Sequence, residues 1–250
     1  MLLCSMLGRP LDALRSSRMD VYGLTHAVMY ASDFGCRRPK LTRSASAIRA
    51  DADTALAIAA HLADWDLLAE ALLAWPMLGL SWGASAAFAL DLLARVQRKD
   101  GFLPGHSFDP LHYDLLEQDQ KLQYLYTTSY HASYVMGMLC AVTLREQRFP
   151  TGCETVPKKY RNASIALCSL IRTCAKPRLW LDEIEALLPA VHWDSLAPLL
   201  LVIILREASA EGDLRTLRCA LEIAVDHNLA SQPVAVQAAG LLSRASRIRV

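Results

Sequence analysis

The stretch DVYGLTHAVMYASDFG, residues 20–35, is the part of the sequence from which the fold is most easily read. As a helix it places Tyr22, His26 and Tyr30 four residues apart on one face. Asp33 follows three residues later on the same face. The rest of the stretch is largely apolar, and buried polar groups cost about 1–3 kcal/mol each unless they form hydrogen bonds. The stretch therefore predicts a helix whose polar face needs partners elsewhere in the chain.

Composition and charge favour a folded chain without a strongly charged partner. The 250 residues are 53% hydrophobic and 20% charged, which allows a sizeable core. A net charge of +1 predicts no nucleic-acid partner. The seven cysteines are irregularly spaced, which indicates reduced thiols in a cytoplasmic protein. The longest apolar run, residues 196–205, is shorter than the roughly 20 residues that span a bilayer, so no membrane span is expected.

Helical patterns follow one another along the whole chain, and no stretch alternates with the period of a strand. We expect helices, in chain order, at residues 2–17, 20–32, 51–74, 82–98, 115–148, 158–174, 180–190, 194–210, 213–228 and 232–246. Asp20 is the expected N-cap of the second and Gly35 its C-terminal stop. The 51–74 helix divides near residues 64–66 in an alternative interpretation, and a break near residues 126–129 is expected in the long helix.

Helices of 12–17 residues with short connections are typical of stacked antiparallel hairpins. We therefore predict an all-α fold, either an α/α toroid or a solenoid-like stack, as a single domain over residues 1–250. Its N-terminal part, residues 1–150, is expected to hold an interior cavity lined by Tyr, Trp and His. Residues 158–246 are expected to add further helical hairpins.

The run LLARVQRKDGF, residues 92–102, carries a helix-to-turn pattern. It resembles the repeat of the terpenoid-cyclase and prenyltransferase toroids, in which Gln is followed by Asp-Gly and an aromatic residue. The resemblance implies that Gln97 caps a neighbouring helix end, that Gly101 makes the turn and that Phe102 packs beneath it. The motif is structural and occurs once, so it bears on the fold and not on the chemistry.

The stretch DADTA, residues 51–55, is similar to the Asp-x-Asp-Asp-Thr-Ala stretch of the class II cyclases in the same superfamily. In that family an aspartic acid protonates an alkene or an epoxide. Aligned on Thr54, the sequence has Ala52 where the family has its central Asp, so Asp53 could act only from an offset position. The alternative is that Asp51 and Asp53 cap and charge the N-terminus of a helix.

The predicted helix within residues 115–148 is the second place where polar aromatic side chains gather. Tyr124, Thr128 and His131 share one of its faces. Tyrosines at steps of four share another face, namely Tyr126, Tyr130 and Tyr134. If this helix faces residues 20–35 across one interior, its imidazole and that of the first helix could transfer protons near neutral pH.

This interpretation assigns roles to side chains from both helices and from the loop before the second. The predicted catalytic residues are His26, Tyr30, Asp33, Tyr130 and His131. The predicted substrate-binding residues are Tyr22, Tyr124, Tyr126, Thr128, Tyr134, His106 and Asp109. A hydrogen-bonded core without catalysis is the alternative for both helices.

Two other groups of residues offer different chemistry. The loop residues His106, Asp109, His112 and Asp114 could ligate Zn, Fe or Mn, although their spacing matches no metal motif. A solvated loop that covers the cavity mouth is the other interpretation. Cys36, which precedes two arginines, could be an activated thiol but has no assigned base. We predict neither a metal nor a cofactor.

The sequence as a whole predicts an enzyme that acts on an apolar or aromatic small molecule by acid–base chemistry. Its most concrete form is a cyclisation or rearrangement in bacterial specialised metabolism, the bacterial setting resting only on Ala-, Leu- and Arg-rich usage. The alternative is a non-catalytic helical module that binds a peptide or a partner protein, and the interpretation allows for a homodimer. An enclosed pocket of a few hundred Å³ (roughly) would favour the enzyme, and an open apolar groove the binding module.

Overall fold

The computed structural model describes residues 5–146, 160–173 and 196–248. Within these ranges every regular element is helical, which confirms the predicted all-α class. The first part of the chain contains a short 3₁₀ helix, Met6–Gly8, and then α1 (Arg18–Ala31), α2 (Ala45–His61), α3 (Trp65–Leu72), α4 (Ala74–Leu78), α5 (Ala84–Asp100), α6 (Pro110–Leu115) and α7 (Gln118–Glu146). The remainder contains α8 (Arg161–Thr173), α10 (Ala197–Glu211), α11 (Leu214–Asp226) and α12 (Pro233–Ile248).

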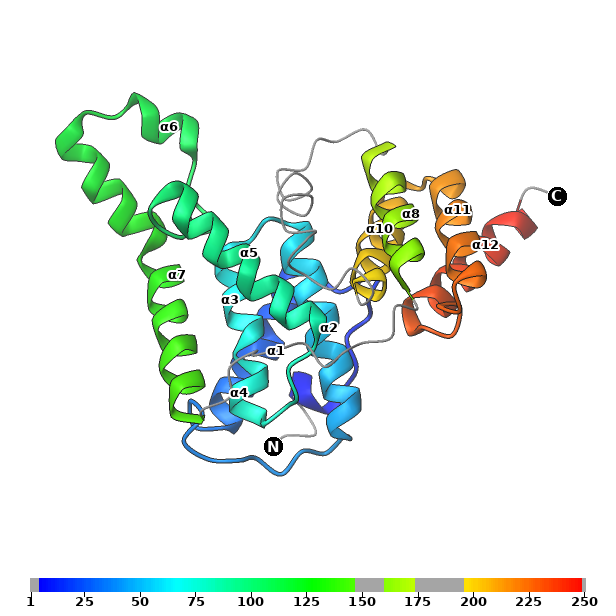
Figure 1. Cartoon of the computed structure of the whole chain (residues 1–250), viewed down its shortest axis with the longest axis horizontal. Helices are drawn as coiled ribbons and strands as arrows, with labels where there is room; N and C mark the ends of the chain where they lie inside the picture. Colours follow the sequence, from blue (N-terminus) through cyan, green and yellow to red (C-terminus); the bar gives the residue numbers. More distant parts are fainter. Residues whose placement is uncertain (1–4, 147–159, 174–195, 249–250) are drawn as a thin grey trace.

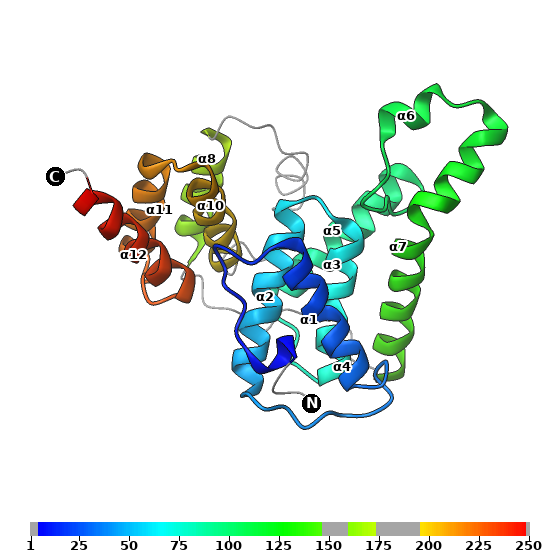
Figure 2. The same cartoon turned by 180° about the vertical axis from the view of Figure 1, so that it is seen from behind.

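The helices form two groups that meet at α2 and α10 (Figure 1). In the first group α3 packs against α1, α2, α5 and α7. In the second group α10 packs against α8, α11 and α12, and it also contacts α2. The view from behind shows the N-terminal segment running beside α2 toward α10, while α6 and the adjoining end of α7 project from the body (Figure 2). The region between α2 and α10 is therefore bordered by both groups.

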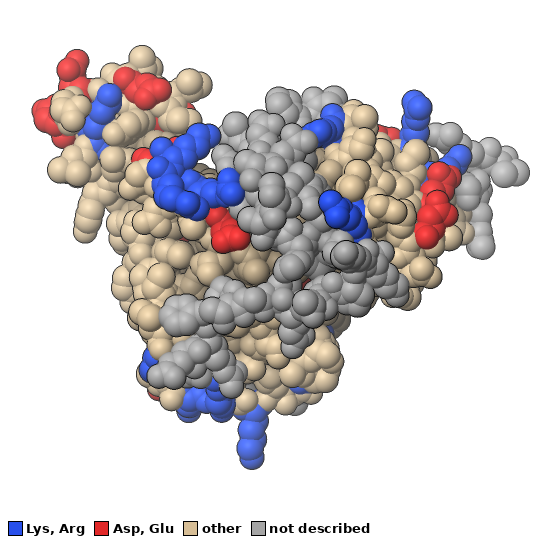
Figure 3. Space-filling view, viewed as in Figure 1, with Lys and Arg blue, Asp and Glu red and all other residues tan. Residues whose placement is uncertain are grey.

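The core is centred on α2, whose middle consists of small and branched apolar residues. Every residue from Ala55 to Ala60 is buried. Small side chains at this helical spacing let neighbouring helices approach closely. None of the described helices combines the length and the apolar character that a membrane crossing requires. On the face in Figure 3, basic and acidic side chains are both scattered across the visible surface.

The start of α1 shows why the first two predicted helices need correction. Ser17 is the N-cap and Asp20 stands at N3, where the two form a reciprocal capping box. The helix thus begins three residues earlier than a cap at Asp20 would allow. The predicted helix over residues 2–17 is wrong for its described part, which contains only the 3₁₀ turn Met6–Gly8 and irregular backbone.

The middle of the chain follows the alternative interpretation of residues 51–74. Ser44 caps α2, and the helix ends near Ala63, whose φ is +50°. Asp64 then caps α3 through its carboxylate, which accepts from the Leu67 N–H. Asp51 and Asp53 consequently lie in the interior of α2, and the interpretation that they cap its N-terminus is wrong.

The remaining boundaries agree with the predictions more closely. The long helix α7 runs through residues 126–129 without the expected break. The last three predicted helices correspond to α10, α11 and α12, and Asp213 caps α11. The predicted helix at residues 180–190 lies outside the described residues.

The turn after α5 has the backbone conformation that the sequence predicts. Gly101 has a φ of +80° and its N–H donates to the Gln97 carbonyl at 2.9 Å. The aromatic residue that follows packs against Phe108, with 5.1 Å between the Phe102 and Phe108 ring centroids. An added Cβ at Gly101 would meet nothing within 4 Å, so a substitution there strains only the backbone.

Replacing Gly101 with valine should lower the free energy of unfolding by about 1–2 kcal/mol, because a β-branched residue resists positive φ. Chemical denaturation of the full chain measures the change. Gly101→Asn is the control, since asparagine tolerates this conformation better and should cost less. Equal stability of the valine variant and the wild type would contradict a structural role for the turn.

Candidate functional site

Both helices that were predicted to carry catalytic histidines pack against α3. Their imidazoles meet two carboxylates that stand one helical turn apart on α3, Asp66 and Glu70. Nδ1 of His131 on α7 lies 2.9 Å from each carboxylate oxygen of Asp66. Nδ1 of His26 on α1 lies 3.8 Å from Oε2 of Glu70. The structure thus brings the two histidines to one cluster, through carboxylates that the sequence prediction did not select.

Glu70 is the buried member of this cluster, with 1% of its side chain exposed. The Thr25 hydroxyl donates to its Oε2 at 2.6 Å. Burial is the main cause that raises the pKa of Glu70, and the negative charge of Asp66 adds to it. The Thr25 hydrogen bond and the two nearby histidines act in the opposite direction. The Glu70 carboxyl therefore holds its proton more readily than an exposed glutamate does.

The His26 ring is held from its own helix. Its Nδ1 lies 3.0 Å from the Tyr22 carbonyl oxygen, and the Tyr22 and His26 ring centroids are 3.8 Å apart. The predicted pairing of Tyr22 with His26 is therefore present as a ring contact. Beside Glu70, the void that Thr25 also lines is only about 10 Å³, which does not admit a substrate.

The expectation that tyrosines line an interior cavity is wrong for four of them. These side chains are exposed: Tyr30, Tyr126, Tyr130 and Tyr134. The physical reason is that α7 buries a narrow stripe of its other residues, among them Ala132, Val135 and Leu139. The prediction that Asp33 shares the helical face of Tyr22 and His26 is also wrong. Asp33 follows the end of α1 with a φ of +51°, and it is exposed.

The other predicted binding residues hold the loop between α5 and α7. The Tyr124 hydroxyl accepts from the Asp109 N–H at 2.9 Å, and the Thr128 hydroxyl donates to the Tyr124 carbonyl at 2.7 Å. Asp109 caps α6. His106 lies 3.4 Å from Asp64, the buried cap of α3. These contacts stabilise the conformation of the loop.

The metal alternative for this loop does not match the structure. His106 and Asp109 have the partners just given, and His112 and Asp114 are exposed. Among the residues that the structure describes, the group with metal-ligand geometry is instead Asp66, Glu70 and His131.

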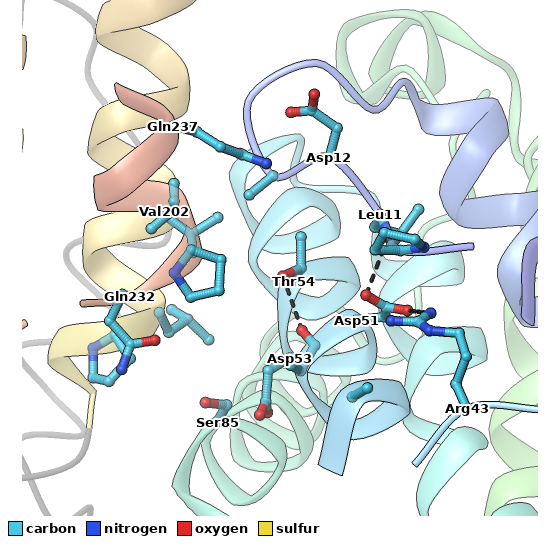
Figure 4. A pocket seen from close by; sticks show the side chains of 18 residues that line it. Leu11, Asp12, Arg43, Asp51, Asp53, Thr54, Ser85, Val202, Gln232 and Gln237 are labelled. Carbon is cyan, nitrogen blue, oxygen red and sulfur yellow. Dashed lines mark hydrogen bonds and ion pairs between the residues drawn. The ribbon is translucent and has the colours of Figure 1, made fainter. Parts of the chain in front are cut away.

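A cavity of about 590 Å³ lies where the two helical groups meet (Figure 4). One wall is formed by the N-terminal segment, α2 and α5, and the other by α10 and the start of α12. Its lining is predominantly apolar, with contributions from Leu11, Ala47, Pro198, Leu199, Val202 and Val234. The polar lining includes Asp12, Arg43, Asp51, Asp53, Thr54, Ser85, Gln232 and Gln237.

Asp53 is the titratable group of this cavity with a displaced pKa. Its side chain is 36% exposed and borders the cavity beside Ser85. Burial raises the pKa of the Asp53 carboxyl to about 6, against the opposing effects of the Arg49 charge and a hydrogen bond with Ser85. The Arg49 Nε atom is 4.0 Å away. Asp53 can therefore hold or release a proton near neutral pH.

The neighbouring carboxylate, Asp51, stabilises the wall of the cavity. Asp51 forms an ion pair with Arg43, and its Oδ1 accepts from the Leu11 N–H at 3.2 Å. On the other side, the Arg206 guanidinium on α10 donates to the Ser16 carbonyl at 2.6 Å and to the Ala13 carbonyl at 3.3 Å. Both contacts fix the N-terminal segment at the cavity.

In the sequence, Asp53 is offset from the position of the catalytic aspartate in the cyclase pattern. The sequence prediction missed the glutamines Gln232 and Gln237, which reach the cavity from the far end of the chain. The sequence contains a local indication that Asp66 and Glu70 lie close together, because acidic residues four apart share one face of a helix. Nothing local in the sequence indicated which histidines would meet that face.

A family model described as "Domain of unknown function (DUF6895)" matches residues 1–141. The matched range includes α1 to α6 and most of α7, and it therefore contains Asp53 and the whole α3 cluster. No curated protein matches the chain, and no solved structure does.

Proposed function

The chain belongs to the DUF6895 family, and we propose that it is an enzyme that performs acid–base chemistry on an apolar small molecule in the cavity beside Asp53. The observation that carries the proposal is a carboxyl group with a pKa of about 6 at the edge of a mostly apolar cavity of about 590 Å³. Cavities of roughly 300–1,000 Å³ whose lining is mainly apolar are typical of small-molecule sites. General acids work best when their pKa lies near the working pH.

The proposed chemistry uses the proton of Asp53 twice. The protonated carboxyl donates it to a basic or electron-rich atom of the substrate, and the carboxylate that results accepts a proton from the product cation. No other reagent is consumed, which suits a cyclisation or rearrangement. The apolar lining would keep water from the cation, while Ser85 would orient the carboxyl through its hydrogen bond.

The resemblance to terpenoid-cyclase toroids supports the same proposal, since Asp53 belongs to the DADTA stretch that carries it. A toroid-like arrangement of the helices, a cytoplasmic location, a role in bacterial specialised metabolism and a homodimer are further parts of the proposal. The catalytic roles of His26 and His131 stay predictions and are not part of this proposal. Both side chains lie at α3, and neither lines this cavity.

Replacing Asp53 with asparagine should lower turnover by about 10²–10⁴-fold, because the amide keeps the shape but has no acidic proton. The wild-type rate should fall about tenfold per pH unit above pH 6, since only the protonated carboxyl donates. The measurement is product formation from a panel of apolar alkenes, epoxides and ketones, followed by gas chromatography and mass spectrometry.

Asp91→Asn is the matched control, because Asp91 is an exposed aspartate on α5 that does not line the cavity. It should leave turnover unchanged, and circular dichroism should show equal helicity in all three proteins. Turnover that survives in Asp53→Asn, or a rate that rises with pH above 6, would refute the assignment of Asp53 as the acid.

A binding module is the second candidate, and one observation favours it. A row of exposed side chains follows α7 at steps of four residues: Leu122, Tyr126, Tyr130 and Tyr134. Exposed apolar and aromatic rows of this kind are typical of surfaces that bind a partner protein. This candidate would replace the first if no substrate of the panel is converted and if the cavity accepts no apolar ligand.

A further inference from the structure

The α3 cluster lies outside the cavity and has no part in the proposed acid chemistry. Its ligand-type atoms come from different helices: Asp66 and Glu70 from α3 and His131 from α7. One such atom of each residue lies within 4.8 Å of the others. His26 from α1 adds a second imidazole, 3.8 Å from Glu70. The cluster therefore combines two carboxylates with one imidazole, and a second imidazole lies beside it.

The distance between the His131 and Asp66 ligand atoms is close to that between two ligands of one metal ion. Nδ1 of His131 is 2.9 Å from each oxygen of Asp66. Two donors that each lie about 2.0–2.2 Å from one metal ion are about 3 Å apart, so this pair needs little movement to share an ion. Glu70 would need to approach by about one ångström or more, and its position one turn along α3 faces the same point.

The burial of the cluster gives a reason for a positive charge between its members. Glu70 is almost fully buried and stands one helical turn from Asp66 on α3, and like charges at this spacing repel each other. A divalent ion bound between the two carboxylates would remove this repulsion. Asp66 and His131 are partly exposed, with 15% and 45% of their side chains accessible, so an ion can enter from solvent and keep a position for water.

Groups outside the ligand set hold the cluster in place. The Thr25 hydroxyl donates to Glu70 at 2.6 Å, and the Tyr22 carbonyl lies 3.0 Å from Nδ1 of His26. Contacts of this kind orient the ligands of protein metal sites and maintain their geometry. His26, which lies beside Glu70 and whose Nδ1 faces the Tyr22 carbonyl, is a positioning residue.

We infer that Asp66, Glu70 and His131 form a binding site for one divalent transition-metal ion, with His26 beside it. Mixed carboxylate and imidazole ligands suit Zn²⁺, Mn²⁺ and Fe²⁺. The inference does not depend on the proposed cavity chemistry, because its test measures bound metal and requires no substrate.

The experiment uses the full chain, stripped with a chelator and then dialysed against Zn²⁺ alone. We expect one equivalent of zinc in the wild type by elemental analysis. His131→Ala and Glu70→Gln should each weaken zinc binding by about 100-fold or more, since each removes a ligand. His112→Ala, which replaces an exposed histidine outside the cluster, should bind as the wild type does.

Two further measurements keep the result interpretable. Asp66→Asn replaces a half-buried ligand with a group of the same size, so it tests the site if Glu70→Gln fails to fold as judged by circular dichroism. Co²⁺ in the wild type should show ligand-field absorption without a thiolate charge-transfer band. Absence of bound zinc, equal binding by wild type and His131→Ala, or a thiolate band would overturn the inference.

Discussion

Replacing Asp51 with alanine should lower the free energy of unfolding by about 3–5 kcal/mol, the range for a buried ion pair that loses one partner. Asp51 is 5% exposed in the interior of α2 and forms an ion pair with Arg43. Its removal leaves a guanidinium that is only 19% exposed without a neutralising charge. The Leu11 N–H, which donates to Asp51 at 3.2 Å, also loses its acceptor.

Urea denaturation of the full chain measures this loss. Asp51→Asn should be less severe, because the amide oxygen can still accept from Leu11 while the charge is absent. The double replacement Arg43→Met with Asp51→Leu is the decisive control, since exchanging a whole buried pair for apolar residues is often neutral. A loss below about 1 kcal/mol in Asp51→Ala would show that solvent already screens the pair.

The substitution Gly105→Ala is expected to detach the loop between α5 and α6 from α7. A Cβ at this position would overlap the carbonyl oxygen of Thr128, which is backbone and cannot rotate away. The loop would have to move, and the Gly105 N–H would lose its 3.2 Å hydrogen bond to the Ser129 hydroxyl. Together these effects should cost about 2–4 kcal/mol.

Hydrogen–deuterium exchange of α6 and the first half of α7 should detect the detachment, and thermal unfolding its effect on stability. Gly137→Ala is the matched control on α7, because an added Cβ there meets nothing within 4 Å. In a helix interior that substitution should stabilise the protein by about 0.5–1 kcal/mol. If both variants unfold at the wild-type temperature with unchanged exchange, the packing of Gly105 on α7 is not as described.

The sequence was informative wherever a local rule decides the structure. The turn at Gly101 follows from short-range chemistry, and so does the helical class. The wrong N-cap predicted for α1 also arises from local chemistry. Both Ser17 and Asp20 are good capping residues, and only the reciprocal hydrogen bonds show that the serine is the cap.

The site could not be predicted to the same extent, because it depends on which helices become neighbours. The polar stripe of α1 indicated that His26 needs a partner elsewhere in the chain, but not that Glu70 on α3 would be the carboxylate beside it. The same periodicity that places tyrosines on one face of α7 does not say whether that face is buried. Tyr126, Tyr130 and Tyr134 all turned out to be exposed. The cavity at Asp53 joins segments separated by up to about 225 residues, which no local pattern encodes.

The two walls of that cavity come from different parts of the chain. The family match ends at residue 141, whereas Pro198, Val202, Gln232 and Gln237 belong to the part that follows it. Asp53, the proton donor that we propose, thus lies in the family domain, and seven of the 18 residues that line the cavity lie in the C-terminal part of the chain. If Asp53 is the acid as proposed, two proteins with the same domain but different C-terminal helices would share a reaction and differ in the substrates that they accept. On that proposal, substrate selectivity would change without any alteration to Asp53.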